Sequence, residues 1–172
     1  MDNTKVFFIS DTHFGHDKII EYCNRPFDNV SEMNQIMIEN WNSVVGKNDL
    51  VFHLGDFAFR NKVDIKNICK QLNGRKILKR GNHDRESNEF YRNCGFENVY
   101  EYAIVYQNFY ILSHANMYLT ADAPWANIHG HIHNNHKVTC MLDNKNLYYN
   151  VSVEVIDYTP ISFQKIKEYY ST

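Results

Sequence analysis

Short hydrophobic runs alternate with helical patterns in the first half of the chain. Three runs of mostly apolar residues, at positions 5–10, 49–54 and 76–79, have the length and the polar borders of buried β-strands. Between them, apolar residues recur every three or four positions over 31–45 and 65–72, which predicts two helices. This strand–helix order predicts parallel strands joined by crossover helices.

The second half of the chain has shorter apolar runs that lie closer to turn residues. The pattern predicts strands over 99–105, 109–113, 126–129 and 147–155, followed by a final helix over 163–170. Tight turns between such short strands are typical of hairpins, so we expect antiparallel strands here. The whole pattern predicts an α/β fold, with mixed sheets in the middle and helices outside, in a single domain of residues 1–172.

Composition and charge narrow the class of protein. The chain is 44% hydrophobic and 15% aromatic, which is typical of a globular protein and too apolar for a disordered one. A net charge of −2 argues against binding to extended nucleic acid, which requires a basic surface. One local basic cluster is interpreted as a solvated face, with contact to a small phosphorylated substrate as the alternative. It consists of Arg75, Lys76, Lys79, Arg80 and Arg85.

The cysteines and the apolar segments indicate a compartment. Cys23, Cys69, Cys94 and Cys140 occur singly, without the paired spacing of a zinc knuckle, and suit reduced thiols in a cytosolic protein. No apolar stretch is long enough for a signal peptide or a membrane span. We therefore expect a soluble cytoplasmic protein without a membrane partner.

Polar residues with metal-binding side chains follow the ends of five predicted strands. In open α/β sheets, ligand sites gather beyond the carboxyl ends of the strands, so these residues are expected to converge. They are Asp11 and His13 after the first strand, Asp56 after the second, Asn82, His83 and Asp84 after the third, His114 after the strand at 109–113, and His131 and His133 after the strand at 126–129. Imidazole and carboxylate groups in such numbers predict a metal site.

The ordered pattern D-x-H, G-D, G-N-H-D, H and G-H-x-H resembles that of the calcineurin-like metallophosphoesterase superfamily. The stretches DTHFGHDKII and HLGDF are similar to a small single-domain branch found in bacteria and phages. The resemblance implies a four-layer α/β/β/α sandwich and two divalent metal ions. It assigns Asp11, His13 and His133 to the first ion, Asn82, His114 and His131 to the second, and Asp56 to both. Such N and O donors without thiolate suit manganese, our first expectation, or Fe, Zn, Ni or Co.

The expected chemistry is hydrolysis of a phosphoester, with phosphodiesters preferred to monoesters and a nucleotide as a plausible substrate. A hydroxide that bridges the two ions would attack phosphorus in line. His83 is the candidate general acid for the leaving oxygen, and Asp84 is the candidate partner that keeps His83 protonated and oriented. His16 and Arg25 are candidate contacts to the substrate phosphate, with a surface salt bridge as the other interpretation of Arg25.

Other interpretations compete with this one. The main alternative is a catalytically silent protein that keeps the metallophosphoesterase fold as a binding or scaffolding module. His83 favours an enzyme, because a non-enzymatic branch of the superfamily lacks that histidine. The remaining histidines are interpreted as structural: His53 in the core, His129 as a support of the site, and His136 as exposed.

Overall fold

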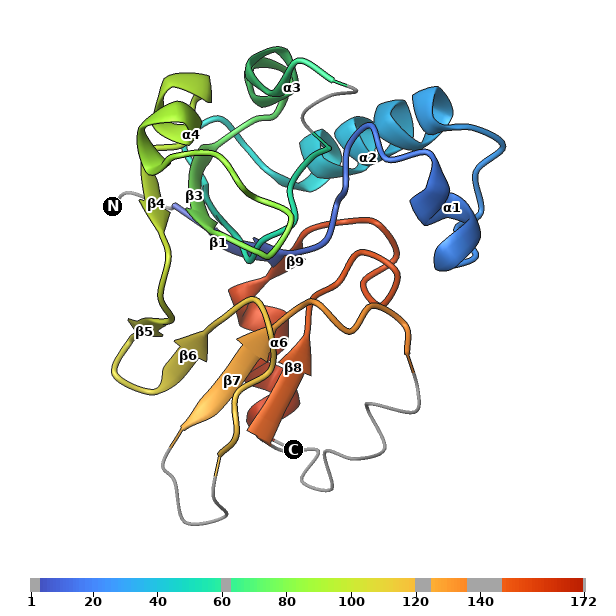
Figure 1. Ribbon diagram of the computed structural model, residues 1–172. Helices are drawn as coiled ribbons and strands as arrows, with labels where there is room; N and C mark the ends of the chain where they lie inside the picture. Colours follow the sequence, from blue (N-terminus) through green and yellow to red (C-terminus); the bar gives the residue numbers. More distant parts are fainter. Residues whose placement is uncertain (1–3, 60–62, 120–124, 136–146, 172) are drawn as a thin grey trace.

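The protein is built from two mixed β-sheets flanked by helices (Figure 1). The computed structural model describes residues 4–59, 63–119, 125–135 and 147–171. The first sheet has the order β4-β3-β2-β1-β9, with strands Asn98–Tyr100, Arg75–Lys79, Leu50–His53, Val6–Ile9 and Ile161–Ser162. The second sheet has the order β5-β6-β7-β8, with strands Ile104–Tyr106, Tyr110–Leu112, Ala126–His129 and Tyr148–Asn150.

The helices cover the outer faces of this pair of sheets. Their bounds are α1 Lys18–Tyr22, α2 Val30–Val44, α3 Ile65–Gln71, α4 Asn88–Cys94 and α6 Phe163–Ser171. Figure 1 shows α2, α3 and α4 together on the side of the first sheet, and α6 behind the second sheet. The predicted class, mixed sheets flanked by helices, is therefore confirmed. No helix in the described residues is both long enough and apolar enough to cross a bilayer.

The strand directions confirm one expectation and overturn another. Strands β1 to β4 are parallel, as the alternating pattern predicted. In the second sheet only β5 and β6 are antiparallel, whereas β6, β7 and β8 run parallel. The expectation of antiparallel strands was wrong there. Parallel neighbours need a connection of about a dozen residues or more, which returns the chain to the end of the sheet where the previous strand began, and the connections over 113–125 and 130–147 are long enough for this. The predicted strand over 99–105 is two strands, β4 and β5, in different sheets.

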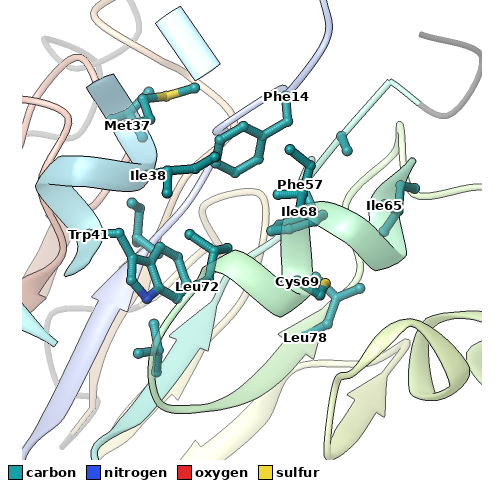
Figure 2. Close-up of a cluster of buried hydrophobic side chains, with 14 of the residues drawn as sticks. Phe14, Met37, Ile38, Trp41, Phe57, Ile65, Ile68, Cys69, Leu72 and Leu78 are labelled. Atoms are coloured by element: carbon teal, nitrogen blue, oxygen red, sulfur yellow. The ribbon is translucent and has the colours of Figure 1, made fainter. Parts of the chain in front are cut away.

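Two hydrophobic clusters hold the layers together. The first lies between α2, α3, α4 and the first sheet, where Trp41, Phe57 and Leu78 are fully buried (Figure 2). The Trp41 indole donates a hydrogen bond to the Asn73 carbonyl at 3.0 Å, which satisfies its polar atom. The second cluster joins the inner face of the first sheet, the second sheet and α6. It includes Phe8, Phe52, Leu112, Ile128 and Phe163.

The two sheets meet at their carboxyl edges. The Ser10 N–H donates to the Val151 carbonyl at 2.9 Å, and the Val153 N–H donates to the Ser10 carbonyl at 3.1 Å. Ser10 follows β1 and Val151 follows β8, so these bonds join one sheet to the other. The loops that leave the ends of parallel strands in both sheets are thereby brought to one place.

Candidate metal centre

One group of candidate ligands consists of Asp11, His13 and His133. Their ligand atoms all lie within 4.8 Å of one another. Asp11 Oδ2 accepts hydrogen bonds from Ser152 Oγ and from the His131 N–H, each at 2.9 Å. Asp11 Oδ1 is buried without a hydrogen-bond partner and lies 3.9 Å from His133 Nε2. A buried carboxylate oxygen left in this way is costly, and a cation between these three side chains would satisfy it.

A second group consists of Asp56, His114 and His131, whose ligand atoms also lie within 4.8 Å of one another. The Asn82 side-chain oxygen joins them at 3.0 Å from His114 Nε2. His114 Nδ1 lies 2.8 Å from the Leu54 carbonyl, an acceptor, so Nδ1 carries the proton. The other nitrogen, Nε2, faces the group. Burial would lower the pKa of His114, but its hydrogen bond to Asp56 and the charges of Asp11 and Asp56 raise that pKa, so a metal bound at Nε2 would displace a proton.

The Asp56 carboxylate lies between the two groups. Its Oδ2 is 3.6 Å from His13 Nε2 and 3.3 Å from His114 Nε2. Its Oδ1 accepts the His83 N–H at 2.8 Å. Burial would raise the pKa of Asp56, but the hydrogen bond and the charge of His114 outweigh burial and hold that pKa well below its usual value. Asp56 is thus an ionised carboxylate that both candidate ions could share.

Burial keeps two of the imidazoles in the form that binds metal. It lowers the pKa of His13 well below the usual value, and it lowers the pKa of His131. A neutral imidazole has a free lone pair, whereas an imidazolium has none.

Five of the seven candidate ligands have a left-handed backbone conformation. Their φ angles are 59° for Asp11, 49° for His13, 55° for Asp56, 70° for His131 and 48° for His133. Residues with a Cβ atom rarely adopt this conformation, which costs about 1–3 kcal/mol each and is concentrated at functional sites. The loops therefore aim these side chains inward against a local energetic preference.

Glycines next to the ligands allow the loops to approach so closely. A Cβ atom on Gly81 would overlap the Asp56 carboxylate, and one on Gly130 would overlap the Asp11 carboxylate. A Cβ atom on Gly55, which has φ +103°, would lie 2.6 Å from the Gly81 nitrogen. Each of these three glycines directly precedes a candidate ligand, so the glycines of the sequence motif are needed for space as well as for turning the chain.

Arg25 differs from the expectation of a substrate contact. Its guanidinium is fully buried and donates to the carbonyls of Asp11 at 2.7 Å and Thr12 at 2.9 Å. It also forms an ion pair with Glu154 at 2.7 Å, whose side chain is 2% exposed. Glu154 in turn accepts from His133 Nδ1 at 3.0 Å. No face of Arg25 is left for a substrate, and together with Glu154 it joins the loop of Asp11 to His133.

Glu154 and His133 shift the pKa values of each other. Burial would lower the pKa of His133, but the hydrogen bonds to Cys23 and Glu154 outweigh burial and raise that pKa to about 10. Burial would raise the pKa of Glu154, but its hydrogen bond with His133 and the charge of Arg25 lower it. Glu154 was missed by sequence reasoning, because it follows no motif and lies beyond the last strand of the second sheet. Its only signal is a carboxylate within the buried run after β8.

Asp84 makes contacts that the sequence did not predict. Its carboxylate is 2% exposed and accepts backbone N–H groups from Asp56 at 2.7 Å, Phe57 at 3.1 Å and Gly81 at 2.8 Å. Both oxygens are used in this way, and no hydrogen bond between Asp84 and the His83 ring occurs in the described structure. The described structure thus shows backbone partners for Asp84, and its role as the partner of His83 stays a prediction. Asp84 connects the two loops that carry Asp56 and Asn82.

His83 and His16 lie beside the candidate ligands. The His83 ring is half-buried, with its centroid 5.2 Å from that of His13. The His16 ring lies 5.4 Å from His13 and stacks on Phe59 at 4.7 Å and 11°. Both side chains thus border the centre without belonging to either ligand group, where a general acid and a phosphate contact would have to lie.

The comparison with protein families identifies the family of the chain. The family model of the calcineurin-like phosphoesterases matches residues 4–167. The chain belongs to this family. Membership confirms the resemblance seen in the motifs, and it implies metal-dependent hydrolysis of phosphoesters.

The relatives of the chain are small proteins. The uncharacterized protein MJ1445 of Methanocaldococcus jannaschii is 42% identical over 169 residues, which cover 96% of this chain and 91% of that protein. The solved structure of the protein of unknown function AQ665 from Aquifex aeolicus is similar with a TM-score of 0.75 and 30% identity, and the match covers 96% of this chain and 99% of that one. The Gene 66 protein of Mycobacterium phage L5 is 38% identical over 87 residues, 49% of this chain and 41% of the phage protein.

The basic cluster of the sequence is occupied by contacts within the protein. Arg75 pairs with Glu97 at 2.8 Å on the surface, and Arg80 pairs with Glu101 at 3.0 Å. Lys76 is buried, and its ammonium donates to the carbonyls at the end of α3 and the turn that follows. The cluster is therefore only partly a solvated face, and these contacts give it a structural role within the phosphoesterase fold.

The histidines expected to be structural are buried where the structure describes them. His53 is fully buried and lies 3.0 Å from Thr12 Oγ1, and burial lowers its pKa to about 3. His129 is 1% exposed, its Nδ1 lies 3.0 Å from the Gly130 carbonyl, and burial lowers its pKa. His136 lies outside the described residues.

Proposed function

We propose that the protein is a phosphodiesterase with two divalent metal ions, held by the seven candidate ligands assigned above. The observation that carries this proposal is the Asp56 carboxylate, whose Oδ2 lies within 3.6 Å of His13 and 3.3 Å of His114, between two ligand groups. One carboxylate shared by two groups is the arrangement that a dinuclear centre requires. The alternative of a single structural zinc ion does not account for two groups without sulfur.

The bound ions would supply a water molecule acidified to near neutral pKa and would offset the charge of the phosphoryl group. The protein residues do the rest. Asp11, Asp56 and the imidazoles of the candidate ligands would fix the position at which a phosphoryl group can bind. His83, which is half-buried beside His13, would give a proton to the leaving oxygen, a step typically worth about 10²–10⁴-fold in rate. The hydrogen bond from its N–H to Asp56 at 2.8 Å fixes the backbone of His83 next to the shared ligand.

A diester fits the surroundings of the centre better than a monoester. A monoester carries close to two negative charges, and a diester carries one. Among the described residues, Arg25 and Arg80 are held in ion pairs with Glu154 and Glu101, so a carboxylate offsets the charge of each. Asn82 and His131 are exposed, which leaves the centre open to a substrate with two ester groups. We infer manganese as the first metal to test, with iron, zinc, nickel and cobalt as alternatives.

The test is hydrolysis of bis-p-nitrophenyl phosphate by protein stripped of metal, with and without added manganese. The wild type is compared with His83→Ala, with Asp56→Asn, and with Glu89→Gln on the exposed side of α4 as the control. We expect manganese-dependent turnover, a loss of about 10²–10⁴-fold in His83→Ala with both metals still bound, and loss of metal and activity in Asp56→Asn. The control should behave as the wild type.

Two results would contradict the proposal. If the protein binds two metals and hydrolyses no phosphoester with any of the five metals, it is a binding protein that has kept the family fold. If His83→Ala turns over as fast as the wild type, another group supplies the proton.

A further inference from the structure

A cavity of about 450 Å³ opens beside the candidate metal centre. It lies between the end of α1 and the loop after β7, which occupy the same side of the molecule in Figure 1. Its walls include Tyr22, His131, Ile132, His133, Asn134 and Asn135. Two of these residues are candidate metal ligands, so a group in the cavity would be attached to, or in contact with, a phosphate held at the centre.

The chemistry of the cavity walls selects the kind of group that fits. No lysine or arginine lines the cavity in the described structure, so it offers nothing to hold a second phosphate. It offers the aromatic ring of Tyr22, the apolar side chain of Ile132 and two side-chain amides. An aromatic face together with amides suits a neutral, flat group with polar edges.

Tyr22 is held in place although most of its surface is open to solvent. The side chain is 68% exposed at the end of α1, a helix that is anchored by the buried Ile19. Its ring meets the His16 ring edge-on, with centroids 6.3 Å apart at 79°. The Asn134 side chain donates to the Cys23 carbonyl at 3.1 Å, which ties the loop on the other side of the cavity to the residue after Tyr22. Among the described residues, only the His16 ring is in ring contact with Tyr22, and it meets Tyr22 edge-on. The face of the Tyr22 ring is therefore presented beside the loop that carries His131 and His133.

We propose that this cavity binds a planar ring of the nucleobase class, carried by one ester group of the substrate, with Tyr22 as the stacking surface. This rests on the proposed function, since the phosphate of the same substrate would lie at the metal centre. The phosphoesterase would then prefer nucleotide esters to esters of other alcohols. The preference would come from one exposed ring and not from charge.

The experiment measures binding by calorimetry to manganese-loaded protein in the His83→Ala background, so that the ligands are not consumed. The probes are adenosine 5′-monophosphate, ribose 5-phosphate and inorganic phosphate. Stacking of a base on an aromatic side chain is worth about 5- to 150-fold in affinity, so the nucleotide should bind tighter than ribose 5-phosphate by that factor. Adding Tyr22→Ala should remove this advantage and leave the other two affinities unchanged, whereas Tyr22→Phe should retain it. Tyr102→Ala, which removes an 83% exposed tyrosine between β4 and β5, is the matched control.

The possible failures are distinguishable. Equal affinities for the nucleotide and ribose 5-phosphate would overturn this inference and leave the metal centre intact. So would a Tyr22→Ala variant in which all three probes bind more weakly by the same factor, because the residue would then only support the fold. If none of the three probes binds the manganese-loaded protein, the centre does not accept phosphate and the proposed function fails as well.

Discussion

Replacing Glu154 tests whether a buried ion pair positions the first group of ligands. Glu154 Oε1 is 2.7 Å from Arg25 and 3.0 Å from His133 Nδ1, and it is the only described carboxylate that contacts both. The substitution Glu154→Gln keeps the shape of the side chain and removes its charge. Arg25 would remain buried without its counterion, and the His133 ring would keep only an uncharged amide oxygen in place of the carboxylate Oε1 that orients it.

The structure sets the size of the expected effects. The Arg25 and Glu154 side chains are 0% and 2% exposed, so solvent does not screen the pair. Removing one partner of a buried pair costs about 3–5 kcal/mol. Glutamine still offers an oxygen to Arg25, so we expect the loss of a charged hydrogen bond only, about 1.5–3 kcal/mol of unfolding free energy. The amide oxygen is a weaker acceptor for His133 Nδ1 than the carboxylate, so we expect metal affinity to fall by up to the roughly 10–100-fold that loss of such an orienting group costs.

The assays are urea unfolding of the metal-free protein and manganese titration by calorimetry. The matched control is Glu97→Gln, which removes an exposed partner of Arg75, where both side chains are about half exposed at 54% and 44%. We expect the control to lose no more than about 1 kcal/mol and to bind manganese as the wild type does. The reasoning is refuted if Glu154→Gln matches this control in both measurements, or if it loses stability while manganese affinity stays unchanged.

Three further substitutions test other parts of the site. Gly81→Ala should lower the free energy of unfolding by about 1–3 kcal/mol and weaken manganese binding, because the added Cβ would overlap the Asp56 carboxylate. The control is Gly46→Ala, whose Cβ would meet only the end of the Asp49 side chain, at 3.2 Å. Equal urea midpoints for the two variants would contradict this expectation. Asp84→Asn should lower the free energy of unfolding by about 1–3 kcal/mol, since one backbone N–H would lose its acceptor. The acidic limb of the pH–rate profile should stay in place. A shift of that limb would instead support Asp84 as the partner of His83. Burial lowers the pKa of His53 to about 3 in the folded protein, from 6.5 in the unfolded chain. Because only the unfolded chain takes up this proton between these values, the free energy of unfolding of the metal-free protein should fall as pH drops below 6.5, by up to about 1.4 kcal/mol per pH unit. His53→Gln should flatten this slope in urea titrations at several pH values.

The sequence predicted the parts of the fold that depend on local pattern. The buried strands and the order of the first half follow from runs such as that of β1, and β7 was predicted at Ala126–His129, its observed bounds. The direction of β6, β7 and β8 could not be read from the pattern, because an apolar run looks the same in a parallel and an antiparallel sheet. The split of 99–105 into β4 and β5 was missed for a similar reason, since the change of sheet is a tertiary event.

The same division holds for the site. Residues that carry the motif were found because each follows a strand end, and the structure brings Asp11, His13 and His133 together as one group. Residues that support the motif from behind were missed, as with Glu154, or foreseen only in part, as with Arg25, whose salt bridge is buried and not on the surface. Their positions depend on contacts between residues that are 129 apart in the chain, which no local pattern reports.

Buried side chains next to the ligands stabilise an unfavourable backbone conformation of the ligands. Five candidate ligands in the left-handed conformation cost roughly 1–3 kcal/mol each, a sum comparable with the 5–15 kcal/mol that stabilises a whole domain. Arg25 donates to the carbonyls of Asp11 and Thr12, and Asp84 accepts the N–H groups of Asp56 and Phe57. These are charged hydrogen bonds to the backbone of the strained loops themselves, so they stabilise the left-handed turns directly. The fold thus holds the ligands in place before any ion binds, because the buried side chains of Arg25 and Asp84 fix a backbone conformation that the ligands would not adopt alone.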